Sequence, residues 1–459
     1  MGTLKNGFRP KPFFLLLQVV LAAALPFSVR VWDRSALLQP SEDPFYTPPT
    51  GYESSAPGTI LRSRAIPGTL AIDSILPINV QAAYQLLYRT TDSLGNPQAT
   101  VTTIIVPHRA DPKKLLSYQI AEDGAYINCA PSYMLQLSSK LEDGSSTSAI
   151  ETLFIIAALD QGWIVNSPDY EGPLGAFASG LQAGQAVLDS VRAALASGSV
   201  TGVSSEAAYQ MWGYSGGSLA TEWAAELQPS YAPELSFIGA ALGGLVPNIT
   251  SVLNTINKGP FADLGPAGIM GLTHAYPDLA VYVDENLVPS KAADFKKAGT
   301  QCLNTDMTQF LFSDIYSYFT QGEEIWNDPV PQSVFQGTGL QGTHGTPKMP
   351  MFFYKAVADE VSPVADTDAL VNKLCSQGAQ IQYVRNGLGE HATEIITGSG
   401  DAFIFLKSRF DGIPAVSGCK TSNVLLDALN PAAIAALGVT VTDALLAILL
   451  LPIGEIGLR

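Results

Sequence analysis

The stretch AAYQMWGYSGGSLATEWAAEL at residues 207–227 decides the fold. Residues 207–215 form an apolar, aromatic run of strand length, and residues 216–228 carry apolar side chains at helical spacing. The junction GYSGG, Gly213 to Gly217, matches the pattern G-x-S-x-G. A sharp turn from a strand into a helix has room only for small residues around its serine. The segment therefore predicts a turn that lifts the Ser215 hydroxyl group to the top of a sheet, with the Gly216 N–H available to an oxyanion.

Serine is a poor nucleophile until a base removes its proton, so the chain must also supply a histidine and a carboxylate. In folds with this turn they follow in the order Ser, Asp or Glu, His. Of the four histidines, His108 and His274 come early, whereas His344 and His391 come late. His391 follows an expected strand at 379–387, where the fold needs its base, and His344 lies in a Gly-rich loop before another strand.

The carboxylate is expected at the end of the strand before that histidine. Asp359 ends the run MFFYKAVAD at 351–359, one strand-helix-strand interval ahead of His391. Glu360, Asp366 and Asp368 are rival carboxylates, and we expect Asp366 and Asp368 to lie in the following turn and helix. The predicted triad is therefore Ser215, Asp359 and His391.

Further strands are expected on both sides of the decisive stretch, and their continuous apolar runs are typical of strands covered on both faces. A short Gly- and Pro-containing link predicts that the first two pair antiparallel. The interval between the strands at 235–244 and 351–359 is too long for a structureless loop. The fold class is therefore α/β: an α/β-hydrolase fold with a mostly parallel eight-stranded sheet, an inserted helical cap and a C-terminal flap. The eight strands are expected at 82–90, 100–107, 115–123, 163–169, 207–215, 235–244, 351–359 and 379–387.

The N-terminus predicts export. Lys5, Arg9 and Lys11 precede an apolar run that is too short to span a bilayer and ends in three alanines, which is the anatomy of a secretory signal peptide. We therefore expect an extracellular protein without a membrane span in its mature chain. The predicted division is a signal peptide at 1–24, an extended arm at 25–60, core at 61–248 and 348–420, cap at 249–347, and a C-terminal flap or tail at 421–459.

Composition excludes several classes of function. The chain has 459 residues, 47% of them hydrophobic and 14% charged, which is too apolar for a disordered protein. Its net charge of −16 would repel phosphate backbones, so nucleic acid is not an expected partner. Four cysteines in an exported chain indicate two disulfides, and their wide spacing fits no zinc site. Asn248 begins the sequon Asn-Ile-Thr and is a candidate for glycosylation or an unmodified loop residue.

Several longer stretches resemble the fungal secretory lipases typified by Candida antarctica lipase A. They are EDPFYTPP at 42–49, SYQIAEDGAYINCAPSY at 117–133, SPDYEG at 167–172, GYSGG at 213–217, SYAPEL at 230–235, ADEVSP at 358–363, EHATEI at 390–395 and FDGIPAVSGC at 410–419. The likeness fades in the second half of the cap and beyond residue 420.

The resemblance implies an activity and further site residues. It implies a triacylglycerol lipase that needs no cofactor and meets its lipid ester substrate at an oil-water interface. We expect the protein to be a monomer. By position the resemblance places Asp123 and Gly216 in the oxyanion hole, and it pairs Cys129 with Cys302 and Cys375 with Cys419. An ionised Asp123 would repel an oxyanion, so it must donate through its backbone N–H or stay protonated.

Three other functions stay open at this point. The same triad would serve a carboxylesterase of soluble short-chain esters or a serine peptidase, and a non-catalytic binding module would normally lack part of it. Within the cap, Phe310, Phe312 and Tyr318 are candidates either for lining an acyl tunnel or for packing the cap's own core.

Overall fold

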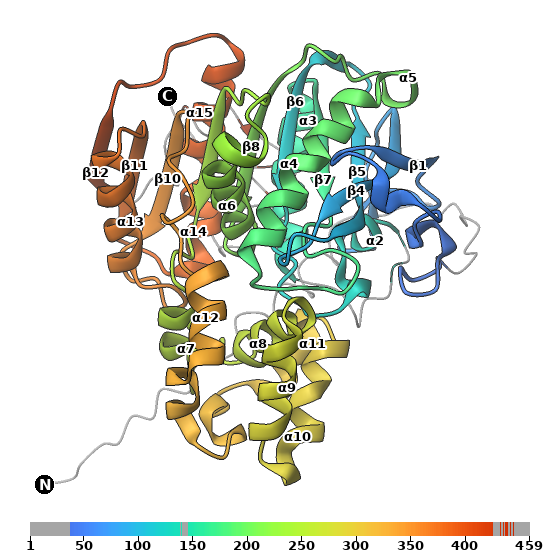
Figure 1. Ribbon diagram of the computed structural model, residues 1–459. Coiled ribbons are helices and arrows are strands. Elements are labelled where there is room, and N and C mark those ends of the chain that lie inside the picture. The colour runs from blue at the N-terminus through green and yellow to red at the C-terminus, as the bar shows by residue number, and fades with distance from the viewer. Residues whose placement is uncertain are drawn as a thin grey trace, which may run out of the picture.

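The centre of the molecule is a ten-stranded sheet in the order β1-β4-β5-β7-β6-β8-β9-β10-β11-β12 (Figure 1). This computed structural model describes residues 37–137, 139 and 146–425, and residues 432, 435, 437, 438, 441 and 444. The predicted signal peptide and most of the predicted flap lie outside these residues. The strands are Ile60–Ala65 (β1), Ala82–Thr91 (β4), Pro97–Val106 (β5), Asp111–Gln119 (β6), Trp163–Pro168 (β7), Ala208–Tyr214 (β8), Gly239–Gly243 (β9), Met351–Ala356 (β10), Ile381–Asn386 (β11) and Cys419–Val424 (β12), with a separate pair Ala71–Ile72 (β2) and Leu76–Pro77 (β3).

All eight expected strands lie in this sheet, and β4 pairs antiparallel with β5 as predicted. The expected count of eight is wrong because β1 and β12 extend the sheet at its two edges. Their sequences, ILRSRA and CKTSNV, contain several polar residues, and none of their side chains is fully buried. An edge strand is not covered on both sides, so it lacks the continuous apolar run that identifies the central strands.

The parallel part of the sheet sets the position of the functional site. Neighbouring strands from β7 to β12 run parallel to one another. Their carboxyl ends therefore meet at one edge of the sheet. In open α/β sheets this edge is where ligands bind.

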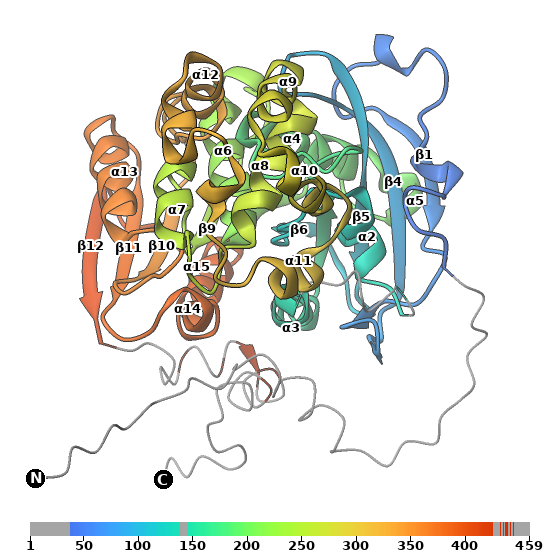
Figure 2. The same ribbon diagram turned by 90° about the horizontal axis from the view of Figure 1, so that it is seen from below.

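Helices cover both faces of the sheet and bury two separate cores (Figure 2). Trp223 is fully buried in the first core and Trp212 in the second. The first face is covered by Gly180–Ala196 (α4), Gly216–Tyr231 (α6) and Val364–Ser376 (α13), and the second by Ser146–Asp160 (α3), His391–Thr397 (α14) and Ser399–Phe410 (α15). Two short helices, Pro131–Met134 (α2) and Gly198–Thr201 (α5), lie in connections.

Between β9 and β10 the chain forms a helical body below the core in Figure 1. Its helices are Ile249–Ile256 (α7), Leu264–Ala275 (α8), Pro277–Asn286 (α9), Pro289–Phe295 (α10), Leu303–Phe310 (α11) and Pro329–Thr338 (α12). They enclose a hydrophobic core of their own, which includes Phe295, Phe319 and Trp326. We call this body the cap, and the division of the chain into domains stays a prediction.

Several connections fix the cap, the arm and the last strand of the sheet. The two ends of the cap pair through an isolated bridge between Asn248 and Leu340. The disulfide Cys129–Cys302 joins a core loop to the start of α11 in the cap, and within the core Cys375–Cys419 joins α13 to β12. In the arm, Phe45 packs on the outer sheet, and Asp43 forms an ion pair of 2.6 Å with Arg64.

Candidate active site

Ser215 stands on a strained turn between β8 and α6. Its φ of 52° lies in the left-handed region, which non-glycine residues rarely adopt. The turn is tight: a Cβ atom on Gly213 would lie 2.2 Å from the Gly217 carbonyl oxygen, and one on Gly217 would lie 2.0 Å from the Gln119 carbonyl oxygen. Only glycine fits at these two positions, so the motif residues are what allow the serine to reach the carboxyl edge of the sheet.

His391 connects Ser215 to Asp359. Its Nε2 lies 2.8 Å from Ser215 Oγ, and its Nδ1 lies 2.7 Å from Asp359 Oδ2. Asp359 follows β10 and His391 begins α14 after β11, so the segments that follow β8, β10 and β11 bring the three side chains together at the carboxyl edge. The other Asp359 oxygen, Oδ1, accepts hydrogen bonds from the backbone N–H groups of Val361 and Ser362.

The charge on Asp359 decides which imidazole nitrogen carries the proton. Burial alone would raise the pKa of Asp359, but the opposing effects of His391 and Lys355 outweigh it and hold this pKa well below its usual value. An ionised carboxylate only accepts hydrogen bonds, so Nδ1 is the donor to Asp359. Nε2 of the neutral ring is then free to accept the Ser215 hydroxyl proton, which is the arrangement a general base requires.

Two further residues hold His391 in place. The Tyr214 hydroxyl group donates to the His391 carbonyl oxygen at 2.7 Å. Glu360 accepts the backbone N–H of His391 at 2.5 Å and that of Ala392 at 3.3 Å, so it caps the start of α14. The sequence presented Glu360 as a rival for the triad, whereas its carboxylate contacts the backbone of His391 and not the ring.

The remaining candidates lie elsewhere. Asp366 and Asp368 are in α13 as expected, and Asp368 contacts Arg385 at 3.2 Å. The Nδ1 atom of His344 hydrogen-bonds the adjacent Thr343, and its ring packs against Trp223. His108 and His274 contact Asn79 and the Gly175 carbonyl, respectively.

Lys355 is a charged contact of Asp359 that the sequence analysis did not single out. Its ammonium group lies 2.8 Å from Asp359 Oδ2 and donates to the Leu245 carbonyl oxygen at 2.8 Å. The side chain is fully buried in β10. A signal for it existed, because a lysine inside the otherwise apolar run MFFYKAVA needs a buried partner.

Asp123 faces Gly216 across the same site. A Cβ atom on Gly216 would lie 2.6 Å from Asp123 Oδ1, so the carboxyl group lies directly over the start of α6. Burial raises the pKa of Asp123 to about 6, although the charge of His391 opposes the shift. Below that pH the side chain is a neutral acid that can donate a hydrogen bond, and above it an anion that cannot.

The position of Asp123 predicts a pH effect. If its protonated carboxyl group donates to the oxyanion, kcat falls as the pH rises through about 6, because the ionised form repels the developing negative charge. Asp123→Asn keeps a neutral donor and removes this decline, whereas Asp123→Ala lowers kcat about 10²–10³-fold below pH 6 and also removes the decline, because no side chain is left to ionise. The measurement is kcat against pH for the three proteins. A decline that persists unchanged in Asp123→Asn would show that the side chain is not the titrating donor.

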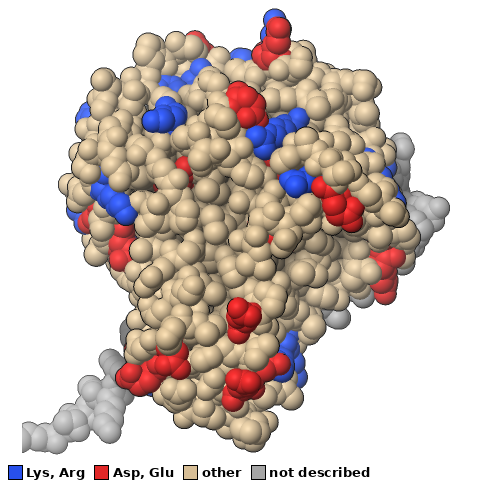
Figure 3. All heavy atoms as spheres, in the orientation of Figure 1, with Lys and Arg blue, Asp and Glu red and all other residues tan. Residues whose placement is uncertain are grey.

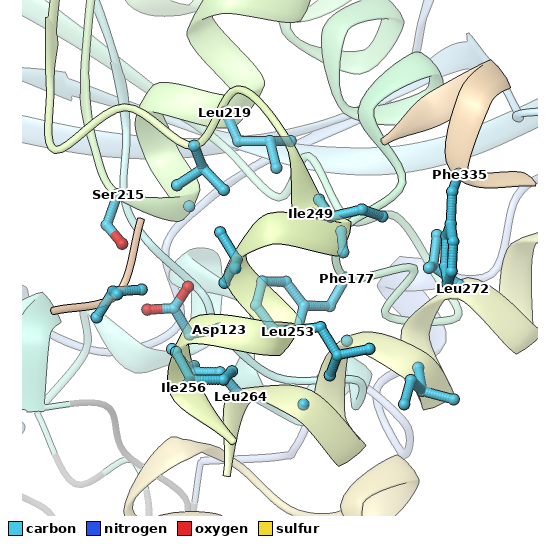
Figure 4. A pocket seen from close by; sticks show the side chains of 18 residues that line it. Asp123, Phe177, Ser215, Leu219, Ile249, Leu253, Ile256, Leu264, Leu272 and Phe335 are labelled. Carbon is cyan, nitrogen blue, oxygen red and sulfur yellow. The ribbon is translucent and has the colours of Figure 1, made fainter. Parts of the chain in front are cut away.

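A cavity opens from Ser215 and Asp123 between the core and the cap (Figure 4). Its empty volume, open mouth included, is about 650 Å³. In Figure 4 the side chains of Ser215 and Asp123 stand at one end, and Leu272 and Phe335 stand at the far end. Apart from the groups at the Ser215 end, the lining is apolar: Phe177, Ala178, Leu219, Val246, Ile249, Val252, Leu253, Ile256, Leu264, Gly265, Gly268, Ile269, Leu272, Phe335 and Val361.

The aromatic candidates from the cap do not line this cavity. Phe310 and Tyr318 pack together within the cap, whereas Phe312 is 60% exposed. Most of the apolar lining comes instead from residues of α7 and α8, whose role the sequence did not reveal because they have the pattern of ordinary core positions. Asn248 caps α7 by accepting from the N–H groups of Thr250 and Ser251, and its glycosylation stays a prediction.

Carboxyl groups accumulate in the interior around the site. Burial raises the pKa of Asp169 and of Asp263 to about 7, and that of Asp306 to about 8. The carboxyl oxygens of Asp263 and Asp306 have no hydrogen-bond partner among the described residues. Groups in such surroundings are stable only when neutral.

Because the pKa values of these buried acids are raised, we expect the protein to lose stability as the pH rises. In the unfolded chain they release their protons near pH 4, whereas the folded protein holds them up to about pH 7 or 8. The folded state therefore binds more protons in this window, and the free energy of unfolding falls by about 1.4 kcal/mol per pH unit for each group. Thermal unfolding should show a lower Tm at pH 8 than at pH 5, and Asp306→Asn should reduce the difference. A Tm that rises over this interval would contradict the assignment.

Comparison with known proteins identifies the family. The secretory lipase family matches residues 135–418. Lipase A of Arthroderma benhamiae is 45% identical over 425 residues, which cover 92% of this chain and 90% of that protein. The chain belongs to the secretory lipase family. Lipase 5 of Candida albicans is 41% identical over 83% of this chain and 83% of its own length.

Solved structures agree with this assignment. The crystal structure of Candida antarctica lipase A matches this secretory lipase with a TM-score of 0.81 at 31% identity, over 90% of this chain and 96% of that one. An esterase, LipA of Xanthomonas oryzae, shares the fold alone at 16% identity, with a TM-score of 0.58 over 78% of this chain and 98% of its own. This secretory lipase therefore has the α/β-hydrolase fold and is a carboxylic ester hydrolase. Among its described residues, no helix has the length and apolar character needed to cross a membrane.

Proposed function

We propose that the protein is an extracellular triacylglycerol lipase that works through an acyl-enzyme on Ser215. The observation that carries the proposal is the unbroken contact from Ser215 through His391 to Asp359 at the mouth of an apolar cavity. The family supports lipid esters as the substrate class. Export is supported by the N-terminal sequence and by the description of the family as secretory.

The geometry supports a two-step mechanism. His391 Nε2 takes the Ser215 proton as Oγ attacks the ester carbonyl, and Asp359 stabilises the imidazolium that forms. Gly216 N–H at the start of α6 and Asp123 face the developing oxyanion. His391 then protonates the departing alcohol, and a water molecule repeats the sequence on the acyl-enzyme to release the fatty acid.

The cavity supports an acyl chain as its occupant. An ester bound at Ser215 can extend one chain along the apolar lining towards Leu272 and Phe335. The face in Figure 3 is compatible with an oil surface: its charged side chains are scattered, and a broad uncharged area covers the junction between core and cap. Burying such a surface costs little desolvation of charge.

The test is hydrolysis of two substrates by the mature chain. Tributyrin is assayed below and above its solubility limit, and a long-chain triglyceride is assayed as an emulsion, with Ser215→Ala as the blank. A true lipase hydrolyses the long-chain emulsion and gains rate on tributyrin above its solubility limit. Activity confined to dissolved short esters would assign the protein to the carboxylesterases instead.

The far end of the cavity should control chain length. Leu272→Trp fills the end opposite Ser215, so we expect the ratio of long-chain to tributyrin activity to fall about tenfold while tributyrin activity is kept. Leu279→Trp makes the same change in the cap core outside the cavity and is the matched control. An unchanged ratio in a folded Leu272→Trp protein would place the acyl chain elsewhere.

A further inference from the structure

The buried lysine beside the triad has a geometry that packing alone does not explain. Lys355 and Asp359 lie four residues apart, and their side chains are both 0% exposed. The Lys355 ammonium group contacts the same oxygen, Asp359 Oδ2, that receives the His391 ring. With Val361 and Ser362 on Oδ1, the carboxylate has four donors and a fixed orientation.

Burying a charged lysine reduces the stability of the fold unless a partner of opposite charge compensates the lost hydration. Burial lowers the pKa of Lys355, and the carboxylates of Asp359, Asp366 and Glu394 oppose that shift. The ammonium group and Asp359 together form a pair without net charge. The imidazole of His391 therefore faces a compensated carboxylate, not an isolated anion.

This difference matters for a general base. An isolated buried anion attracts a proton to the neighbouring imidazole, and the protonated ring cannot accept the Ser215 proton. A cation bound to the same carboxylate oxygen compensates that anion and weakens the attraction. Other groups near His391 are Glu360 at its backbone, Asp123 across the site and the ring of Tyr214; Glu394, further along α14, faces Lys355.

We propose that Lys355 is a positioning residue of the catalytic relay, which fixes the Asp359 carboxylate and keeps His391 available as a base at acidic pH. The inference rests on the proposed triad. It also fits the Asp123 carboxyl group, whose pKa burial raises to about 6, so that it can donate a hydrogen bond below that pH. Lys355 would then keep the base His391 active, and Asp123 would supply the oxyanion donor, in the same acidic pH range.

The test is the pH dependence of kcat/KM for p-nitrophenyl butyrate in four variants. Lys355→Met and Lys355→Gln remove the charge, and the Gln side chain keeps a hydrogen-bond donor. Lys355→Arg keeps the charge. Lys407→Met removes an exposed lysine that pairs with Asp411 on α15 and is the surface control.

In both neutral variants, the midpoint of the acidic limb of the kcat/KM profile should lie about one pH unit or more higher than in the wild type. One pH unit below the wild-type midpoint, their activity relative to the plateau then falls about tenfold further. Lys355→Arg and Lys407→Met should keep the wild-type midpoint, and KM should change little because Lys355 does not line the cavity.

A folded neutral variant whose acidic limb coincides with that of the wild type would overturn the inference. So would a shifted limb in a folded Lys355→Arg protein, even if both neutral variants fail to fold, because the positive charge would then be present without keeping the limb in place. Loss of serine-dependent activity in the wild type would instead overturn the proposed function, which separates the two failures.

Discussion

Replacing Ser215 by Ala should lower kcat for ester hydrolysis about 10⁶-fold. The hydroxyl group is the only nucleophile in contact with His391 among the described residues, at 2.8 Å. Without it, the remaining acceleration can come only from substrate binding and the oxyanion donors. The measurement is p-nitrophenyl butyrate turnover, in which a small residual rate requires highly pure protein.

A neighbouring serine supplies the matched control. Ser218 lies one turn further along α6, and its hydroxyl group donates to the Ser215 carbonyl oxygen at 2.8 Å. Ser218→Ala removes a hydroxyl group from the same helix and should change kcat less than tenfold. A Ser215→Ala protein that keeps more than about a hundredth of wild-type kcat would exclude Ser215 as the nucleophile.

Asp359→Asn should lower kcat about 10⁴-fold with a small effect on KM. The amide cannot play the role of the carboxylate, because its NH₂ group favours the imidazole tautomer with the proton on the wrong nitrogen. It also leaves the Lys355 ammonium group buried without its anion, so a loss of stability of about 3–5 kcal/mol is expected as well. Kinetics at a temperature far below the Tm of the variant, with its fold verified by circular dichroism, separate the two effects.

Substitutions of Asp368 and Glu360, the rival carboxylates, test whether either residue takes part in catalysis. Asp368→Asn should leave kcat within about threefold of the wild type, because this carboxylate contacts Arg385 and Tyr383 of β11 and not the His391 ring. Glu360→Gln should give an intermediate loss, since it weakens the cap that holds the His391 backbone and leaves the ring contact intact. If Glu360→Gln lost as much activity as Asp359→Asn, the assignment of Asp359 as the acid of the triad would no longer be supported over Glu360.

The sequence by itself determined the order and type of the central elements and the identity of the family. Continuous apolar runs mark strands that helices cover on both sides, and the glycines around Ser215 mark a turn that no larger residue can form. The rule that the nucleophile, acid and base follow in that order selected Asp359 and His391 from several candidates. These inferences need only local patterns along the chain.

Only the tertiary structure decided what depends on contacts between distant segments. The polar edge strands β1 and β12 are held by their neighbours, since their own sequences carry no strand signal that stands out. The aliphatic lining of the cavity looks like any buried helix face until the cap is placed on the core. The role of Lys355 also became visible only in the structure. Its burial and its pairing with Asp359 depend on how distant segments pack in the folded interior.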